Sequence, residues 1–217
     1  FEAIFEIGGY LAGHVDQHRT SPRDDIITHL LEARMPDGRP LTDEEILGVC
    51  ILLLLAGIDT TWSAIGSSLL HLATNPDDRR RLRDEPELIN SATEEFLRVF
   101  APVTMAREVI EATEVGGCPM RKGARLLLPF PSGNRDPEIF DRPDNVVLDR
   151  EANRHFAFGV GIHRCLGSNL ARMELRVALQ TWLERIPEFT LTDPDAVTWS
   201  AGQVRGPRTL PFAFTAG

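Results

Sequence analysis

The chain has 217 residues, of which 42% are apolar and 25% are charged, a globular composition with room for one or two domains. Its formal net charge of −9 argues against a general nucleic-acid-binding protein. Three widely spaced cysteines fit a reducing cytoplasm better than a disulfide framework. The longest apolar run, residues 46–58, is shorter than the ~20 residues that a membrane span needs. We therefore expect a cytoplasmic protein that binds neither nucleic acid nor a membrane.

Helical periodicity dominates the first third of the chain. Residues 1–18 have the pattern of the end of a helix, and residues 26–34 that of a short amphipathic helix. The sequence Thr42-Asp43-Glu44-Glu45 is a capping box, which predicts a long helix over residues 43–74. The first half of that helix is apolar on nearly all sides, so we expect it to be buried.

The middle of this long helix carries polar residues, in the sequence Ala-Gly-Ile-Asp-Thr-Thr over residues 56–61. An acid and two threonines in a buried helix are unfavourable unless they are used or hydrogen-bonded. Gly57 weakens the helix locally, and Thr60 can bond back to an earlier carbonyl and bend it. A kinked structural helix and a functional site are equally compatible with these residues alone.

Further helices are predicted over residues 77–84 and 86–100. The second contains Glu95 and Arg98, whose spacing of three residues places them on one face of the helix, where they can form an ion pair. Such a pair is usually exposed and contributes little. Residues 108–130 show an alternating pattern interrupted by glycine-containing turns, which predicts short strands in β-hairpins. Residues 134–150 are predicted to form an irregular loop. A terminal hairpin is expected over residues 189–214.

Residues 156–167 combine three glycines, two aromatics and Cys165, directly before a predicted helix over residues 166–186. Glycine allows backbone conformations that other residues avoid and lets a flat ligand approach closely. No acid lies between residues 153 and 173, so a thiolate at this helix start sits in a locally positive field. The cations are Arg154, His155, His163, Arg164 and Arg172. The alternatives are an inert buried cysteine, a zinc ligand or a Cys/His nucleophile. Too few partners are near for zinc, and the loop does not resemble the local signatures of cysteine proteases.

The pattern Phe158-Gly159-x-Gly161-x-His163-x-Cys165-x-Gly167 closely resembles the haem-binding loop of the cytochrome P450 family. By this resemblance, Cys165 is the thiolate ligand of the iron of haem b. Phe158 and Gly159 then lie against the cofactor, and His163 contacts a haem propionate.

Three more segments resemble the family's signatures and follow its order along the chain. The resemblance implies that Asp59 and Thr60 form the acid–alcohol pair that passes protons to oxygen, with Gly57 beside the cofactor. It also implies that residues in the segments that follow stabilise the fold, contact the substrate or bind a haem propionate. Those residues are Glu95, Arg98 and their expected partner Arg150 (structural), Val103, Thr104 and Met105 (substrate) and Arg107 (propionate). The tip of the C-terminal hairpin, residues 199–204, is also expected to reach the substrate.

The resemblance covers essentially the whole chain and implies a mainly α fold with small β-sheets. Residues 1–217 would be the C-terminal part of a single haem domain, because the chain begins inside a helical pattern without an initiator Met. The activity would be monooxygenation of a small organic substrate with O2. Electrons would come ultimately from NAD(P)H, through a ferredoxin or flavodoxin-type partner or a fused reductase. Residues 59–63, 102–107 and 204–208 resemble the subgroup in which the reductase is fused.

Two other classes remain open. One is a peroxide-driven enzyme of the same fold, and the other is a non-catalytic haem- or ligand-binding protein. Asp59 and Thr60 weigh against both, since neither class needs an acid–alcohol pair to supply protons.

Overall fold

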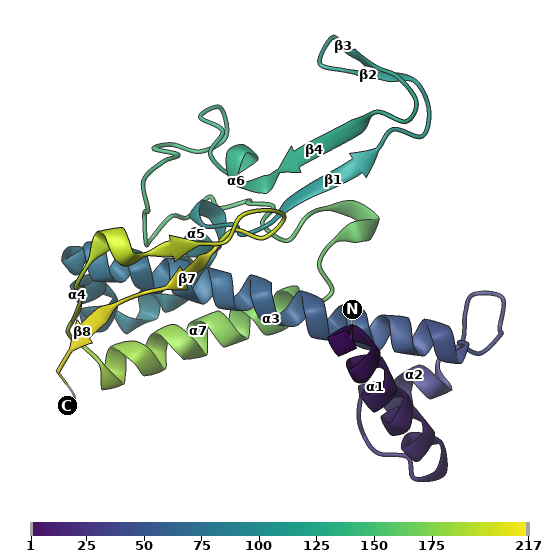
Figure 1. The fold of residues 1–217 in the computed structure, drawn as a ribbon. Coiled ribbons are helices and arrows are strands. Elements are labelled where there is room, and N and C mark those ends of the chain that lie inside the picture. The colour runs from purple at the N-terminus through teal and green to yellow at the C-terminus, as the bar shows by residue number, and fades with distance from the viewer. Residues whose placement is uncertain (1, 216–217) are drawn as a thin grey trace. The chain divides into compact units, whose positions relative to one another are not determined.

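The computed structural model describes residues 2–215, and the side chains from residue 5 onward. The fold is mainly helical with small sheets, as the sequence predicts (Figure 1). The helices are α1 (Glu2–Thr20), α2 (Ile26–Glu32), α3 (Asp43–Thr74), α4 (Pro76–Asp84), η1 (Pro86–Leu88), α5 (Ile89–Val99), α6 (Phe130–Gly133), η2 (Gly161–His163), α7 (Ser168–Arg185) and η3 (Pro194–Ala196). The strands are β1 (Thr104–Glu108), β2 (Thr113–Val115), β3 (Cys118–Met120), β4 (Arg125–Pro129), β5 (Phe189–Leu191), β6 (Thr198–Trp199), β7 (Pro207–Thr209) and β8 (Phe212–Phe214).

The chain divides within α3, after Ile58, into two compact units. The first unit packs α1, α2 and the N-terminal half of α3 around Val15, Ile46 and Cys50. The capping box starts α3 as predicted. The Thr42 amide donates to Oε2 of Glu45 at 2.9 Å, and the Glu45 amide donates to Oγ1 of Thr42 at 3.2 Å.

The expected all-round burial of the first half of α3 is wrong for this chain. Ile46 and Cys50 lie on the buried stripe, whereas Leu52, Leu55 and Ile58 are 64%, 63% and 54% exposed. These side chains are exposed because the described residues of the first unit pack against only one side of the helix. Helix α3 is long and apolar enough to cross a bilayer, with a mean hydropathy of 1.9 in its most apolar window. Core helices of soluble proteins meet the same criterion of length and composition.

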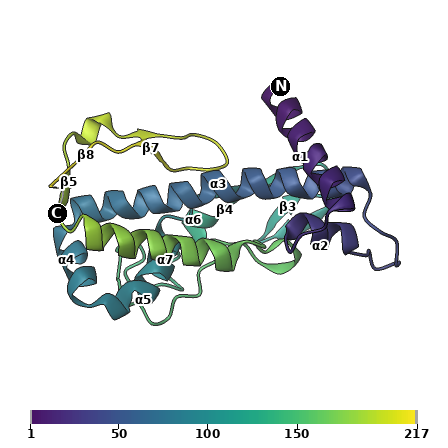
Figure 2. The ribbon, with the colours of Figure 1, turned by 90° about the horizontal axis from the view of Figure 1, so that it is seen from below.

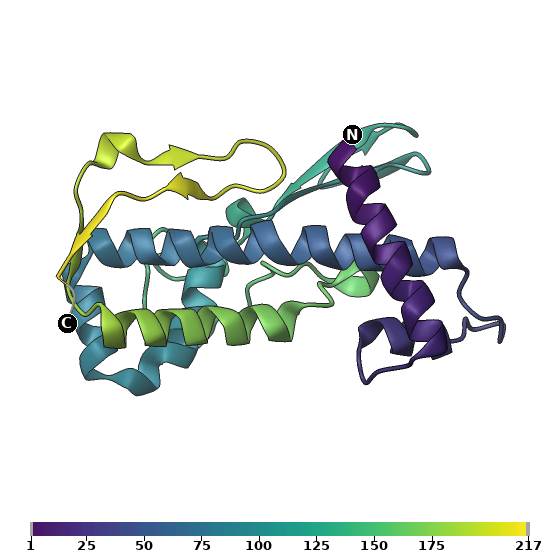
Figure 3. The same cartoon turned by 60° about the horizontal axis from the view of Figure 1, so that its bottom comes forward.

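The second unit contains the larger core, between the C-terminal half of α3 and helices α4, α5 and α7. Figures 2 and 3 show α7 alongside α3, and fully buried side chains such as Leu72, Phe96 and Leu179 fill the space between helices. The stripe of α7 that is buried is Leu175, Leu179 and Leu183. The parallel stripe of Leu170, Met173 and Val177 is about half exposed.

The β-structure of this unit consists of antiparallel pairs. Strand β1 pairs with β4, and the β2–β3 hairpin extends from that pair, as expected for residues 108–130. At the C-terminus β5 pairs with β8 and β6 with β7, and the β6–β7 hairpin lies on the side of α3 opposite α7 (Figure 3). The chain packs closely on α3 there, because a Cβ on Gly206 would lie 2.3 Å from the Ser63 side chain. The backbone at Gly206 therefore has room for glycine alone.

Candidate functional site

The cysteine loop, which we define as residues 155–167, is held in shape by its own backbone. Gly159 and Gly161 both have φ of +68°, a conformation that favours glycine. The Cys165 amide donates to the Phe158 carbonyl at 2.8 Å and so closes the loop. The Cys165 side chain is exposed. The loop thus presents a thiol to its surroundings on a fixed backbone.

The helix after the loop begins later than the sequence predicts. Gly167 is the N-cap and α7 starts at Ser168, so Cys165 lies in the turn before the helix and Leu166 is 86% exposed. The helix therefore begins two residues later than predicted, and Cys165 lies three residues before its first residue. The first free amides of α7 still follow the thiol directly in the chain.

The loop fits a haem better than a polydentate metal site. Among residues 2–215 no group of three or more His, Cys, Asp or Glu side chains is placed to hold a metal ion. A single exposed thiol is instead flanked by exposed apolar side chains, with Val160 at 74% and Ile162 at 97% exposure. No atom lies within 4 Å of a Cβ built at Gly161. A soft thiolate beside an open apolar surface suits the iron of a large apolar macrocycle.

The other predicted cofactor residues lie on three different elements. His163 is exposed in η2, two residues before Cys165. Arg107 is partly buried in β1, and its Nη1 donates to the carbonyl of Ala106 at 2.9 Å. Gly57 lies in α3 at the end of the first unit, with no atom within 4 Å of a Cβ built there.

Asp59 on α3 forms an ion pair that the sequence did not predict. Both guanidinium Nη atoms of Arg208 in β7 donate to its carboxylate, and the Nη2–Oδ2 distance is 3.0 Å. These hydrogen bonds lower the pKa of Asp59, although partial burial acts in the opposite direction. Thr60 follows Asp59 in the helix, so the predicted acid–alcohol pair starts from an acid that is held as a carboxylate.

The predicted substrate segment pairs with the tip of the C-terminal hairpin. Val103 forms an antiparallel bridge with Val204, and the Thr104 amide donates to the Gln203 carbonyl at 2.9 Å. The Gln203 side chain reaches the sulfur of Met105 at 3.2 Å. The two segments expected near the substrate, residues 103–105 and 199–204, are therefore adjacent in the fold.

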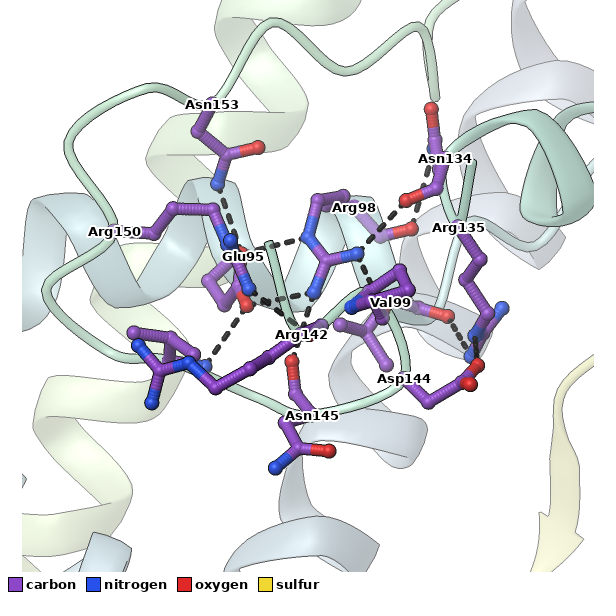
Figure 4. A network of polar contacts seen from close by, with 12 residues as sticks. Glu95, Arg98, Val99, Asn134, Arg135, Arg142, Asp144, Asn145, Arg150 and Asn153 are labelled. Atoms are coloured by element: carbon purple, nitrogen blue, oxygen red, sulfur yellow. Dashed lines mark hydrogen bonds and ion pairs between the residues drawn. The ribbon is translucent and has the colours of Figure 1, made fainter. Parts of the chain in front are cut away.

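Glu95 lies at the centre of a buried network that fixes the irregular loop (Figure 4). Its side chain and that of Arg98 are 0% exposed, and Arg98 donates through Nε and Nη2 at 2.8 Å each. Arg150, the partner expected from the sequence, donates its Nε at 2.9 Å. Burial raises the pKa of Glu95, but the hydrogen bonds from both arginines leave it below its usual value. Asn134 extends the network to the loop, accepting from the Phe156 amide at 3.0 Å.

A second network, next to the first, was missed from the sequence. Glu94 accepts two hydrogen bonds from Arg172 and contacts His155 at 3.0 Å. The sequence showed His155 and Arg172 as cations around Cys165 but gave no sign of their partner. These residues are 61 and 78 positions from Glu94, a separation at which no helical or strand periodicity links side chains.

The sequence matches the family model described as Cytochrome P450 over residues 10–197. It is 40% identical over 188 residues to Probable cytochrome P450 127A1 of Sinorhizobium fredii, covering 87% of this chain and 45% of that protein. It is 38% identical to Mycinamicin IV hydroxylase/epoxidase of Micromonospora griseorubida, covering 98% and 55%. The solved structure of Cytochrome P450 PksS from Bacillus subtilis superposes with a TM-score of 0.93 at 35% identity, covering 99% and 56%.

The chain thus spans about half the length of the curated relatives it matches. The family model covers residues 10–197, and the structural likeness to PksS covers 99% of the chain. The open loop that presents Cys165 lies within the matched region. The chain belongs to the cytochrome P450 family.

Proposed function

We propose that this chain is the C-terminal part of a haem domain and that the protein is a haem-thiolate monooxygenase. The observation that carries the proposal is the Cys165 thiol, exposed on a loop closed by the Cys165–Phe158 backbone hydrogen bond. The bound haem b would supply reductive activation of O2 and the insertion of one oxygen atom into the substrate. Cys165 would hold its iron as a thiolate.

The remaining site residues have separate tasks in this proposal. Phe158, Gly159 and Gly57 would pack against the cofactor, and His163 and Arg107 would bind its propionates as hydrogen-bond donors. Asp59 would hold a proton on its carboxyl group, and Thr60 Oγ1 would pass it into the pocket. The ion pair with Arg208 has to open before Asp59 can take up that proton, because it favours the carboxylate.

The substrate would be a small organic molecule that contacts Val103, Thr104 and Met105. Relatives named Mycinamicin IV hydroxylase/epoxidase and Vitamin D(3) 25-hydroxylase support this class, since both names describe oxidation of an organic compound. Electrons would come ultimately from NAD(P)H, through a ferredoxin or flavodoxin-type partner or a fused reductase. We place the protein in the cytoplasm, without a nucleic-acid or membrane partner.

A peroxide-driven enzyme of the same fold is the second candidate, and the Asp59–Arg208 ion pair is the observation that favours it. Such an enzyme would not need Asp59 as a proton carrier, because peroxide brings its own oxygens and protons. Product formation with peroxide but none with a reductase would select this alternative.

The absorption spectrum of the reduced, CO-bound full-length protein tests the proposal. A strongly red-shifted main band that Cys165→Ser abolishes is expected for thiolate ligation. Cys118→Ser is the matched control, because Cys118 is likewise an exposed free cysteine but lies in β3. An ordinary haem–CO band, or no haem band, would refute the assignment of Cys165 as the iron ligand.

A further inference from the structure

Glu94 connects helix α5 to both ends of the cysteine loop. Its Oε1 accepts from Arg172 Nε at 2.7 Å and its Oε2 from Arg172 Nη2 at 2.9 Å, which is a bidentate pair with the first turns of α7. The same Oε2 lies 3.0 Å from Nε2 of His155, the first residue of the loop. One carboxylate therefore fixes the chain before and after Cys165.

The tautomer of His155 follows from its hydrogen bonds. The Ala157 amide donates to Nδ1 at 3.2 Å, so Nδ1 is an acceptor and carries no proton. The proton of the neutral ring is then on Nε2, which donates it to Glu94. Because the His155 side chain is only 2% exposed, Glu94 rather than bulk water is the acceptor for its Nε2 in this structure.

Arg172 transmits this arrangement to Phe158. Its Cζ lies 4.5 Å from the centroid of the Phe158 ring, a distance at which a guanidinium is attracted to an aromatic face. The Phe158 carbonyl in turn accepts from the Cys165 amide at 2.8 Å. The path from Glu94 to Cys165 thus has three contacts: the ion pair with Arg172, the guanidinium stacked on Phe158, and the backbone hydrogen bond from Cys165 to Phe158.

Glu94 also differs from its neighbour Glu95 in what it contacts. The two side chains leave α5 in different directions, since successive helical residues are rotated by about 100°. Glu95 bonds the irregular loop, through Arg150 and the Val147 amide, whereas Glu94 bonds the cysteine loop. Burial raises the pKa of Glu94, but hydrogen bonds from His155 and Arg172 lower it to about 2. It is therefore a carboxylate at neutral pH.

We propose that Glu94 is a positioning residue for Cys165, which acts through His155 and through Arg172 stacked on Phe158. This inference rests on the proposed function only in naming Cys165 as the iron ligand. Glu94 keeps the loop closed and compensates the charge of Arg172, whose guanidinium is stacked on Phe158. Its removal should loosen the loop first and weaken thiolate ligation as a consequence.

The test compares Glu94→Ala, Glu94→Gln and Arg172→Ala in the full-length haem protein. Hydrogen exchange of a peptide spanning residues 155–166 reports loop closure through the Ala157 and Cys165 amides. Exchange should become at least about tenfold faster in Glu94→Ala, since charge-assisted hydrogen bonds are lost at a partly buried site. Glu94→Gln keeps one acceptor oxygen and should give a smaller increase, which also covers the case in which the alanine variant does not fold.

Arg176→Ala is the matched control. Arg176 lies one turn further along α7 and also bonds α5, through Asn90 at 2.8 Å, but it does not contact the loop. It should leave loop exchange unchanged. In Glu94→Ala and Arg172→Ala, but not in the control, a larger share of the reduced CO complex should show the band of thiol rather than thiolate ligation.

Equal loop exchange in the Glu94 variants and the parent would overturn the proposal. So would the same acceleration in Arg176→Ala, or a faster loop with an unchanged CO band. Failure of the proposed function is distinguishable, because the parent protein itself would then lack the thiolate band while its loop exchange still reports on Glu94.

Discussion

Replacement of Glu95 by alanine is expected to remove most of the stability of the second unit. The carboxylate, 0% exposed, accepts from Arg98, from Arg150 and from the Val147 amide at 2.8 to 2.9 Å. Asn153 adds a contact at 3.1 Å. Glu95→Ala would leave two guanidinium groups, 0% and 8% exposed, without their carboxylate.

The magnitude follows from what remains after the substitution. Breaking a buried ion pair by removing one partner costs about 3–5 kcal/mol, and the orphaned Val147 amide adds about 1–3 kcal/mol. The three carbonyls that accept from Arg98, those of Asn134, Pro143 and Asn145, stabilise its position but do not neutralise its charge. A loss of at least about 4 kcal/mol is comparable with the whole stability of many domains, about 5–15 kcal/mol.

Urea unfolding followed by far-UV circular dichroism measures this loss in the full-length protein, with Glu85→Ala as the matched control. Glu85 also accepts a hydrogen bond from an arginine, Arg81 Nε at 3.2 Å, but the side chains of Glu85 and Arg81 are 46% and 38% exposed. Exposed pairs contribute little, so the control should shift the midpoint only slightly. Equal midpoints for Glu95→Ala and Glu85→Ala would refute the reasoning from burial.

Two further substitutions test the contacts of α3 with the C-terminal strands. Gly206→Ala should destabilise the protein by about 1–3 kcal/mol, because the added Cβ would lie 2.7 Å from Cα of Ser63. Thermal unfolding measures this loss, and Gly48→Ala is the control without it, because no atom lies within 4 Å of a Cβ built at Gly48. Arg208→Ala should raise the pKa of Asp59 in an NMR titration, because the hydrogen bonds that lower it are removed. In the parent, this pair stabilises the fold above the ordinary carboxyl pKa of 3.8 and ceases to do so as the pH falls through the lowered value. An unchanged titration in Arg208→Ala would contradict the ion pair.

Local signals predicted the elements of this fold well. The capping box at Thr42 and Glu45 starts α3 where expected, and the long helix ends at Thr74. The hairpins expected over residues 108–130 were visible because turn glycines separate the strands; Gly116 and Gly117 have φ of +58° and +79°. Each of these features depends on residues a few positions apart, which is the range over which sequence patterns are informative.

Burial and distant pairing were predicted less well. An apolar sequence shows that a side chain can be buried but not which face has a partner, so Leu52 and Leu55 were expected in a core and are exposed. The bond between Asp59 and Arg208 joins residues 149 positions apart, and neither residue type predicts the other. Arg150 was an exception, because family resemblance rather than periodicity suggested it as the partner of Glu95.

The electrostatic field at Cys165 shows how one distant partner changes a local interpretation. The sequence places five basic side chains and no acid around the thiol, which predicts a positive field. In the fold, Glu94 compensates the charge of Arg172, and Nδ1 of His155 accepts from the Ala157 amide, so two of those five groups add no net positive charge. The charge that stabilises a thiolate must then come mainly from Arg164, Arg154 and the first amides of α7. Because Arg154 and Arg164 are exposed, salt should screen their part of the field more than that of the helix amides next to the thiol.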